Sequence, residues 1–151
     1  MPASQTTPDT DAALQLDNQL CFALYSASLA MTKLYKPQLD ALGLTYPQYL
    51  VMMVLWEHGA VSVSGLGEHL FLDSGTLTPL LKRMEAAGWL QRSRSTEDER
   101  KVLVAPTPAG RKLKSRAARV PACMLRATGC SLPEVVALTQ QVRELRARLS
   151  P

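Results

Sequence analysis

Residues 71–101, FLDSGTLTPLLKRMEAAGWLQRSRSTEDERK, decide the fold, because an amphipathic helix here runs directly into a basic hairpin. In the first half of this stretch, apolar residues recur at the three-and-four spacing that places side chains on one face of an α-helix. A helix with one such face is typical of an element that packs on a core and leaves its other face open. The apolar residues are Leu77, Leu80, Leu81 and Met84.

The opposite face of this helix is small, hydroxylated and cationic. Such a face can approach the floor of a DNA major groove, hydrogen-bond base edges and phosphates, and bring no negative charge into the contact. We therefore predict a recognition helix. Its predicted DNA-facing residues are Ser74, Gly75, Thr76, Thr78, Pro79, Lys82 and Arg83.

The ends of this helix are marked by local signals. Asp73 or Ser74 can cap its start, and Gly88 stands where a helix usually stops. Pro79 lies in the interior, where proline removes a backbone hydrogen bond. We therefore expect the helix either to begin late, near Thr76, or to bend at Pro79.

After Gly88, two short strand-like segments, residues 89–95 and 101–105, flank a polar tip at 96–100. A lone hairpin of this kind is more often an ordinary solvated surface, but the helix before it favours a DNA-binding wing. We expect Asp98 to hold the guanidinium of Arg100 through a paired hydrogen bond. Besides Asp98, the predicted DNA-binding residues of the wing are Arg92, Arg94, Arg100 and Lys101, which would contact phosphates and the minor groove.

The composition fits one domain with a polyanionic partner. The chain has 151 residues, of which 46% are hydrophobic, enough for a single core. Its net charge is +4, which suits binding to nucleic acid. Basic residues concentrate in the wing and in residues 111–116, whereas the first twenty residues carry only acidic charges.

The sequence shows no secretory signal, and its longest strongly apolar run, residues 49–56, is too short to span a bilayer. We expect a cytoplasmic protein without membrane association. The three cysteines lack CxxC or Cys/His spacing, which argues against a zinc site or a disulfide framework. His58 and His69 also lack metal-ligand spacing, so we predict no metal and no other cofactor.

The amino-terminal region is expected to hold an arm and a helix. Residues 1–13 are polar and rich in proline and threonine, which favours disorder. From Leu14 an apolar stripe predicts a helix to about Tyr35, with Pro37 marking its end.

Beside the apolar stripe, a thiol and several hydroxyls fall within one narrow sector of this helix. Phenolic donors stabilise thiolate over thiol, and the thiolate is the form that attacks a peroxide. The alternative is a small buried cysteine among packing tyrosines, which helix position alone favours slightly. The residues of the sector are Cys21, Tyr25, Ser28, Thr32 and Tyr35.

Tyr35 follows Cys21 by fourteen residues, which corresponds to about 20 Å along one helix. The two side chains therefore cannot touch within one chain. If they serve the same chemistry, the helix must cross its antiparallel copy in a dimer.

The chain order predicts four parts. Residues 1–13 form the arm, 14–45 a dimerisation helix and connection, 46–107 a winged helix-turn-helix lobe, and 108–151 carboxyl-terminal dimerisation helices. In the lobe, Thr45 and Pro47 start a helix, residues 61–63 form a strand that pairs with the wing, and 64–71 form the first helix of the helix-turn-helix.

Past the wing, Thr107 and Pro108 start a helix that Pro121 interrupts, and Ser131 caps another. The last helix carries a heptad seam that is too short to act alone and suits a dimer interface. A two-fold homodimer implies a palindromic operator. The predicted fold class is mainly α with a small antiparallel β wing. The seam residues are Val135, Leu138, Val142, Leu145 and Leu149.

Four strings resemble hallmark segments of the MarR family of winged-helix repressors and, within it, of the organic-hydroperoxide-sensing (OhrR) group. They are LDNQLCF at 16–22, LTYPQYL at 44–50, LDSGTLTPLLKR at 72–83 and DER at 98–100, and the resemblance covers nearly everything from Leu14 to Leu149. It implies that Cys21 is the peroxide-reactive cysteine. It also implies that Tyr35 and Tyr46 of the partner subunit hydrogen-bond this cysteine, with Tyr25 nearby.

In family members with two redox cysteines, a sulfenic acid at the sensing cysteine condenses with a resolving cysteine of the other subunit. Alignment places Arg126 at the usual resolving position, flanked by Cys123 and Cys130, which are seven residues apart and so expected on nearly one helical face. Either cysteine can serve as the resolving residue in place of Arg126. Cys130 is slightly favoured, because a cysteine at its alignment position is familiar in the group. In a third route, a low-molecular-weight thiol caps Cys21.

The sequence thus predicts a repressor and not an enzyme. The reduced homodimer binds a palindromic operator in double-stranded DNA, and organic hydroperoxide, the inducer, releases it by oxidising Cys21. One alternative is a MarR-type repressor that senses a small phenolic ligand beside Cys21. A thiol peroxidase is the less favoured alternative because of the basic wing.

Overall fold

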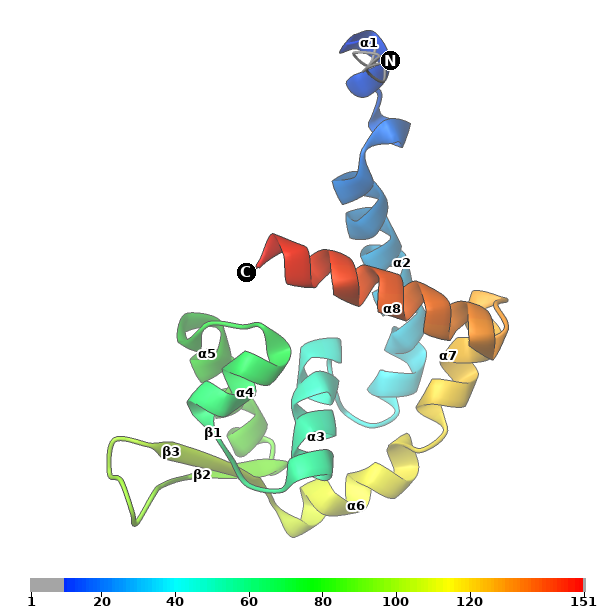
Figure 1. Cartoon of the computed structure of the whole chain (residues 1–151). Helices are drawn as coiled ribbons and strands as arrows, with labels where there is room; N and C mark the ends of the chain where they lie inside the picture. The colour runs from blue at the N-terminus through cyan, green and yellow to red at the C-terminus, as the bar shows by residue number, and fades with distance from the viewer. Residues whose placement is uncertain (1–9, 151) are drawn as a thin grey trace. The chain divides into compact units, whose positions relative to one another are not determined.

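The computed structural model describes residues 10–150, which form helices with one small sheet (Figure 1). This confirms the predicted fold class. The chain divides into two compact units, Met1–Leu34 and Tyr35–Pro151. The elements are α1 (Thr10–Ala13), the 3-10 helix η1 (Leu16–Asn18), α2 (Leu20–Asp40), α3 (Tyr46–His58), β1 (Val61–Ser62), α4 (Val63–Leu70), α5 (Ser74–Ala86), β2 (Leu90–Arg94), β3 (Val102–Pro106), α6 (Pro108–Ala117), α7 (Val120–Thr128) and α8 (Leu132–Leu149).

The helix predicted from Leu14 to about Tyr35 is wrong at both ends. Side-chain amides of Asn18 and Gln19 donate to carbonyls of Ala12 and Ala13, at 2.7 and 2.6 Å, and hold a break before α2. At the other end α2 runs through Pro37 to Asp40. Proline costs the helix one hydrogen bond, but this part of α2 is largely exposed, so water can satisfy the freed carbonyl. Of the predicted arm, residues 1–9 lie outside the described residues, and the other four form α1.

The lobe from α3 to β3 is a winged helix-turn-helix. Its sheet has the order β1-β3-β2, and both pairs are antiparallel. The short strand at Val61 and Ser62 pairs with β3, as predicted from the sequence. The hairpin of β2 and β3 projects beyond α4 and α5 (Figure 1). Helix, turn, helix and wing therefore follow one another in the order that the sequence predicts.

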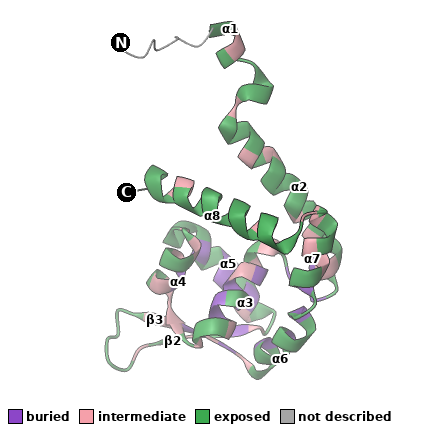
Figure 2. Cartoon of the chain, turned by 45° about the vertical axis from the view of Figure 1, so that its right-hand side comes forward, coloured by how far each residue is buried: buried purple, intermediate pink, exposed green. Residues whose placement is uncertain are grey.

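The core of this lobe lies where α3, α4, α5 and the sheet meet (Figure 2). The apolar face predicted for the recognition helix is buried, and that helix supplies much of the core. The central side chains, all nearly inaccessible to water, are Val51, Met52, Leu55, Leu66, Leu77, Leu81, Met84, Leu90 and Val104.

Side-chain caps set the helix starts. Thr45 and Gln48 form a capping box at α3, and Ser131 caps α8 through the backbone N–H of Glu134. Asp73, and not Ser74, caps α5: the backbone N–H of Thr76 donates to Asp73 Oδ1 at 2.7 Å. These three caps were all predicted.

Of the two outcomes expected from Pro79, a late start or a bend, the late start is wrong, because α5 begins at Ser74 and continues through Pro79. The strong Asp73 cap fixes the first turn. The carbonyl that Pro79 leaves without a donor belongs to Gly75, which is exposed, so water can satisfy it.

The last helix, α8, contains no buried residue and appears almost wholly exposed in Figure 2. Its large exposed apolar side chains are Leu132, Val136, Leu138, Val142 and Leu149. Leu138, Val142 and Leu149 belong to the predicted heptad seam, and exposed apolar side chains along one helix face often mark an interaction site. Within residues 10–150, no helix is long and apolar enough to cross a bilayer.

Candidate DNA interface and redox cysteines

The face of α5 predicted to contact DNA is open to solvent. Every residue assigned to it on α5, from Ser74 through Arg83, is exposed, whereas Leu77, Leu80 and Leu81 of the same helix are buried. The backbone hydrogen bond from Thr76 lowers the pKa of the Asp73 carboxyl. Since Asp73 already occupies that N–H, the hydroxyl and cationic side chains of α5 are the groups left for phosphates and bases.

The turn between α4 and α5 brings two helices close together. A Cβ at Gly67 would lie 2.7 Å from the Leu72 carbonyl oxygen, so glycine permits this approach. Phe71 adopts the left-handed conformation, with φ 57° and ψ 39°, and ends α4. The turn therefore depends on glycine at one position and tolerates a bulky residue in a strained conformation at another.

The wing is tied to the recognition helix by Glu85, which sequence reasoning missed. Glu85 Oε2 accepts from the Arg92 backbone N–H at 2.7 Å, and Oε1 accepts from Arg92 Nη2 at 3.1 Å. These hydrogen bonds lower the pKa of the Glu85 carboxyl. Arg92, predicted to contact DNA, is thus engaged within the lobe, where it fixes β2 against the last turn of α5. The only signal of this pairing in the sequence was the presence of a carboxylate in the last turn of α5.

The tip of the wing is held by its own backbone. Arg94 Nη1 donates to the carbonyl of Glu99 at 3.0 Å, across the hairpin. The predicted pairing of Asp98 with the Arg100 guanidinium is wrong: Asp98 Oδ1 accepts from the Arg100 backbone N–H at 3.1 Å. A short aspartate side chain reaches the N–H two residues on more readily than a distant guanidinium.

Arg100 and Lys101 remain as the outward cations of the wing. Both are exposed, and no side-chain partner is found for either among residues 10–150. They border a hollow of about 280 Å³ between the wing and the helix-turn-helix, to which Thr78 of α5 and Ser64 of α4 also contribute. This hollow brings cations and hydroxyls from three elements to one surface, which suits a phosphate backbone.

The base of the wing is clamped to α6. The Thr107 hydroxyl donates to the carbonyl of Gly88 at 2.6 Å, and Trp56 Nε1 donates to the carbonyl of Gly110 at 2.9 Å. A Cβ at Gly110 would collide with the Trp89 carbonyl oxygen. The helix that follows the wing, α6, therefore packs so closely against the start of the wing that position 110 has no room for a side chain.

Two tyrosines predicted to support a thiolate lie together. The Tyr35 and Tyr46 ring centroids are 5.0 Å apart, and Tyr49, absent from the prediction, lies 5.9 Å from Tyr35. The pKa of Tyr35 is raised mainly by burial and further by the neighbouring phenols. The pKa of Tyr46 is raised by burial. Both phenols are thus O–H donors at neutral pH. The spacing of Tyr46 and Tyr49 on one helix was the signal that could have identified the third ring.

Cys21 lies in the first turn of α2 and is exposed. The alternative of a buried cysteine among packing tyrosines would therefore require a partner subunit to cover Cys21. Tyr25, one turn further along α2, is also exposed. Within the amino-terminal unit, a thiol and a phenol thus share one open stretch of helix.

The sequence suggested that Cys123 and Cys130 share one helical face, but in the structure they do not. The helix α7 ends at Thr128, and Gly129 follows in the left-handed conformation, so Cys130 lies in the link to α8. The Cys123 Sγ accepts from Arg126 Nη2 at 3.4 Å, whereas the Cys130 thiol donates to the Thr128 carbonyl at 3.7 Å. The two candidate resolving thiols therefore have opposite surroundings.

The rings of His58 and His69, which lack metal-ligand spacing in the sequence, stack on each other with centroids 4.6 Å apart. Among the described residues, no group of three or more histidine, cysteine, aspartate or glutamate side chains is arranged to hold a metal ion.

Comparison with known proteins agrees with this arrangement. Residues 33–117 match the family model described as transcriptional regulator SarA/Rot. The organic hydroperoxide resistance transcriptional regulator of Bacillus subtilis (strain 168) is 55% identical over 112 residues, which are 74% of this chain and 76% of that protein. The chain belongs to the MarR family, in its organic-hydroperoxide (OhrR) group.

Solved structures of another regulator, AbfR of Staphylococcus epidermidis, resemble this OhrR-type chain. Reduced AbfR bound to DNA has a TM-score of 0.75 and 32% identity, covering 92% of this chain and 96% of that one. The disulfide form of AbfR has a TM-score of 0.59 and 34% identity, with coverage of 89% and 95%. The winged helix-turn-helix of the OhrR-type chain thus has counterparts solved both on DNA and with a disulfide.

Proposed function

We propose that this chain is a redox-sensing repressor. As a reduced homodimer it binds a palindromic operator in double-stranded DNA, and organic hydroperoxide, the inducer, releases it by oxidising Cys21. The observation that carries the proposal is an exposed Cys21 thiol ahead of a complete winged helix-turn-helix, in a chain 55% identical to an organic hydroperoxide resistance regulator. Such a protein acts in the cytoplasm and reacts once per oxidation, so it is not an enzyme.

The proposed roles of the different parts of the chain follow from which side chains they expose. Residues 46–107 read the DNA through α5 and the wing, while residues 14–45 and 108–151 form the dimerisation body. Support comes from the exposed apolar side chains of α2, such as Leu20 and Leu29, and of α8, such as Leu138. A two-fold dimer would present two α5 helices to half-sites about one helical turn apart.

The proposed chemistry begins at the Cys21 thiolate. Its sulfur attacks one peroxide oxygen, an S–O bond forms as the O–O bond breaks, and the leaving alkoxide takes a proton and departs as the alcohol. The product is a sulfenic acid. Tyr35 and Tyr46 of the partner subunit are the proposed donors to the thiolate, with Tyr25 beside it. Burial raises the pKa of both phenols, so each keeps its proton at neutral pH.

In the second step a resolving thiolate attacks the oxidised sulfur of Cys21. An S–S bond forms, and the hydroxide leaves as water after protonation. Of the two candidates we propose Cys123, because Arg126 Nη2 donates a hydrogen bond to its sulfur. The Cys130 thiol instead donates a hydrogen bond to the Thr128 carbonyl. Capping of Cys21 by a low-molecular-weight thiol is the remaining route.

The test is binding of an operator fragment by the full chain, reduced and then treated with one equivalent of cumene hydroperoxide. The expected result is loss of binding in wild type and retained binding in Cys21→Ser. Binding that survives peroxide in wild type would contradict the redox mechanism and leave a repressor that answers to a small non-covalent ligand. Steady-state peroxide turnover with a thiol reductant would instead identify a thiol peroxidase.

The same peroxide treatment identifies the resolving residue when the Cys123→Ser and Cys130→Ser variants are compared by non-reducing electrophoresis. With Cys123 as the resolving residue, the covalent dimer is lost in Cys123→Ser and kept in Cys130→Ser. The opposite pattern would assign the role to Cys130, and a band in both variants would require that each can substitute for the other.

A further inference from the structure

Phe71 is an unusual residue for the turn of a helix-turn-helix. It is the one non-glycine residue within 10–150 that has a positive φ, and its side chain is 62% exposed. Glycine or asparagine adopts this conformation with less strain than a bulky aromatic residue. An exposed aromatic ring on a strained backbone is explained more readily by a contact of the ring than by the needs of the turn.

The ring has such a contact. The guanidinium carbon of Arg146 lies 3.4 Å from the centroid of the Phe71 ring. A planar guanidinium at this distance over an aromatic face is a cation–π stack. Arg146 belongs to the last turn of α8, and the carboxyl-terminal end of that helix lies above α4 and α5 in Figures 1 and 2.

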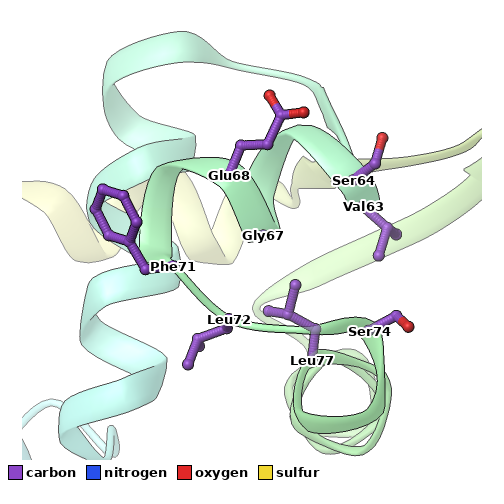
Figure 3. A pocket seen from close by; sticks show the side chains of 8 residues that line it. All are labelled: Val63, Ser64, Gly67, Glu68, Phe71, Leu72, Ser74 and Leu77. Atoms are coloured by element: carbon purple, nitrogen blue, oxygen red, sulfur yellow. The ribbon is translucent and has the colours of Figure 1, made fainter. Parts of the chain in front are cut away.

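The stack is close to the start of the recognition helix. Phe71 stands two residues before Asp73, the residue that caps α5. The ring also borders a mainly apolar hollow of about 550 Å³ formed by α4, the turn and the first part of α5 (Figure 3). A shift of Phe71 would therefore act on the turn that sets the direction of α5.

The other end of α8 is next to a cysteine. Cys130 immediately precedes Ser131, the cap of α8. Cys123 lies within the preceding short helix, α7. The 18-residue α8 buries no side chain. A movement of the linker at its start can thus be passed to Arg146 by a continuous helix that few contacts hold in place.

We propose that Phe71 and Arg146 form a latch that holds the helix-turn-helix in its operator-binding orientation, and that oxidation releases the operator by withdrawing Arg146. Both are positioning residues, because they act on DNA through α5. The role of oxidation rests on the proposed function, whereas the role of the latch in the reduced protein does not.

The test is operator affinity of the reduced full-length protein with Arg146→Ala, Phe71→Gly and the double variant. Each single variant is expected to weaken binding by about 3- to 10-fold, the range for a partly exposed cation–π contact. The double variant should be no weaker than the weaker single one, because both remove the same stack. Arg148→Ala, in the same turn of α8, is the matched control and should bind like wild type.

Phe71→Gly separates the latch from a general packing role. Glycine relieves the left-handed strain, so thermal stability is expected to stay equal or rise while operator affinity falls. Arg146→Lys keeps the charge but loses the planar stack, and should bind more weakly than wild type.

Three results would overturn the latch: multiplicative effects in the double variant, which would indicate that Arg146 contacts phosphate directly; an equal loss in Arg148→Ala; or wild-type affinity in Arg146→Ala. All three are read in reduced protein, so they are independent of whether peroxide acts at Cys21. If the reduced variants behave as expected but wild type is not released by peroxide, the latch stands and its withdrawal by oxidation is wrong.

Discussion

The winged lobe and the last helix use apolar residues in opposite ways. In the lobe, Leu66, Leu77 and Val104 are fully buried within one chain, whereas α8 carries an apolar seam with no buried residue. The lobe is therefore complete by itself, whereas α8 leaves its apolar side chains uncovered within one chain. The difference fits the proposed function, in which each copy folds its own DNA-reading lobe and α8 packs against a second copy.

The largest expected effect is in the lobe core. Leu81→Ala should destabilise the folded protein by about 2–5 kcal/mol, because it removes a buried side chain and leaves a cavity. Denaturant unfolding measures the loss. Leu138→Ala on α8 is the matched control and should change the unfolding free energy of a monomeric sample far less; similar losses would contradict the comparison.

A smaller loss is expected at the junction of lobe and α6. Gly110→Ala places a methyl group against the Trp89 carbonyl, and such overpacking costs about 1–3 kcal/mol. Thermal unfolding measures it, with Gly129→Asn as control, because Gly129 has open space around it and a left-handed conformation, φ 70° and ψ 6°, that asparagine tolerates. An unchanged melting temperature in Gly110→Ala would mean that α6 is not clamped to the wing.

On α8, Leu138→Glu should leave the lobe folded but weaken the dimer. The side chain is 58% exposed in the single chain, and a charge on an apolar interface should raise the dimer dissociation constant by about 10-fold or more, equivalent to about 1.4 kcal/mol. Sedimentation equilibrium measures this. Unaltered dimerisation would exclude the seam from the interface.

The smallest expected effect is a change in pH dependence at the wing. The folded pKa of Glu85 is lowered by its bonds to Arg92, so the stability it contributes is present above the ordinary carboxyl pKa and is lost as pH falls through the lowered value. Glu85→Gln should therefore flatten the melting temperature between neutral and acidic pH. Parallel pH profiles for the variant and wild type would show that this contact contributes no stability.

Local patterns in the sequence were enough to predict the elements of the lobe. Apolar spacing identified the buried face of α5, and the capping residues Thr45, Asp73 and Ser131 identified three helix starts. These features depend on neighbours within one turn of helix, which a sequence displays directly.

Features that depend on competing or distant partners could not be predicted. Pro37 and Pro79 lie inside helices because the carbonyls they free face solvent, and at Pro79 the Asp73 cap also fixes the start of the helix. The pairing of Glu85 with Arg92 joins a helix to a strand. Cys123 lies inside α7, and the left-handed Gly129 after that helix places Cys130 outside it. Similarly, nothing in the spacing of Phe71 and Arg146 indicates that they meet.

The most direct test of the central claim mixes two full-length variants, Cys21→Ser and Cys123→Ser, and treats the re-equilibrated dimers with one equivalent of organic hydroperoxide. If sensing joins Cys21 of one copy to Cys123 of the other, non-reducing electrophoresis shows a covalent dimer in the mixture and in neither variant alone. A wild-type protein that oxidises to a monomer with an internal disulfide, and no covalent dimer in the mixture, would contradict the claim that sensing requires two copies.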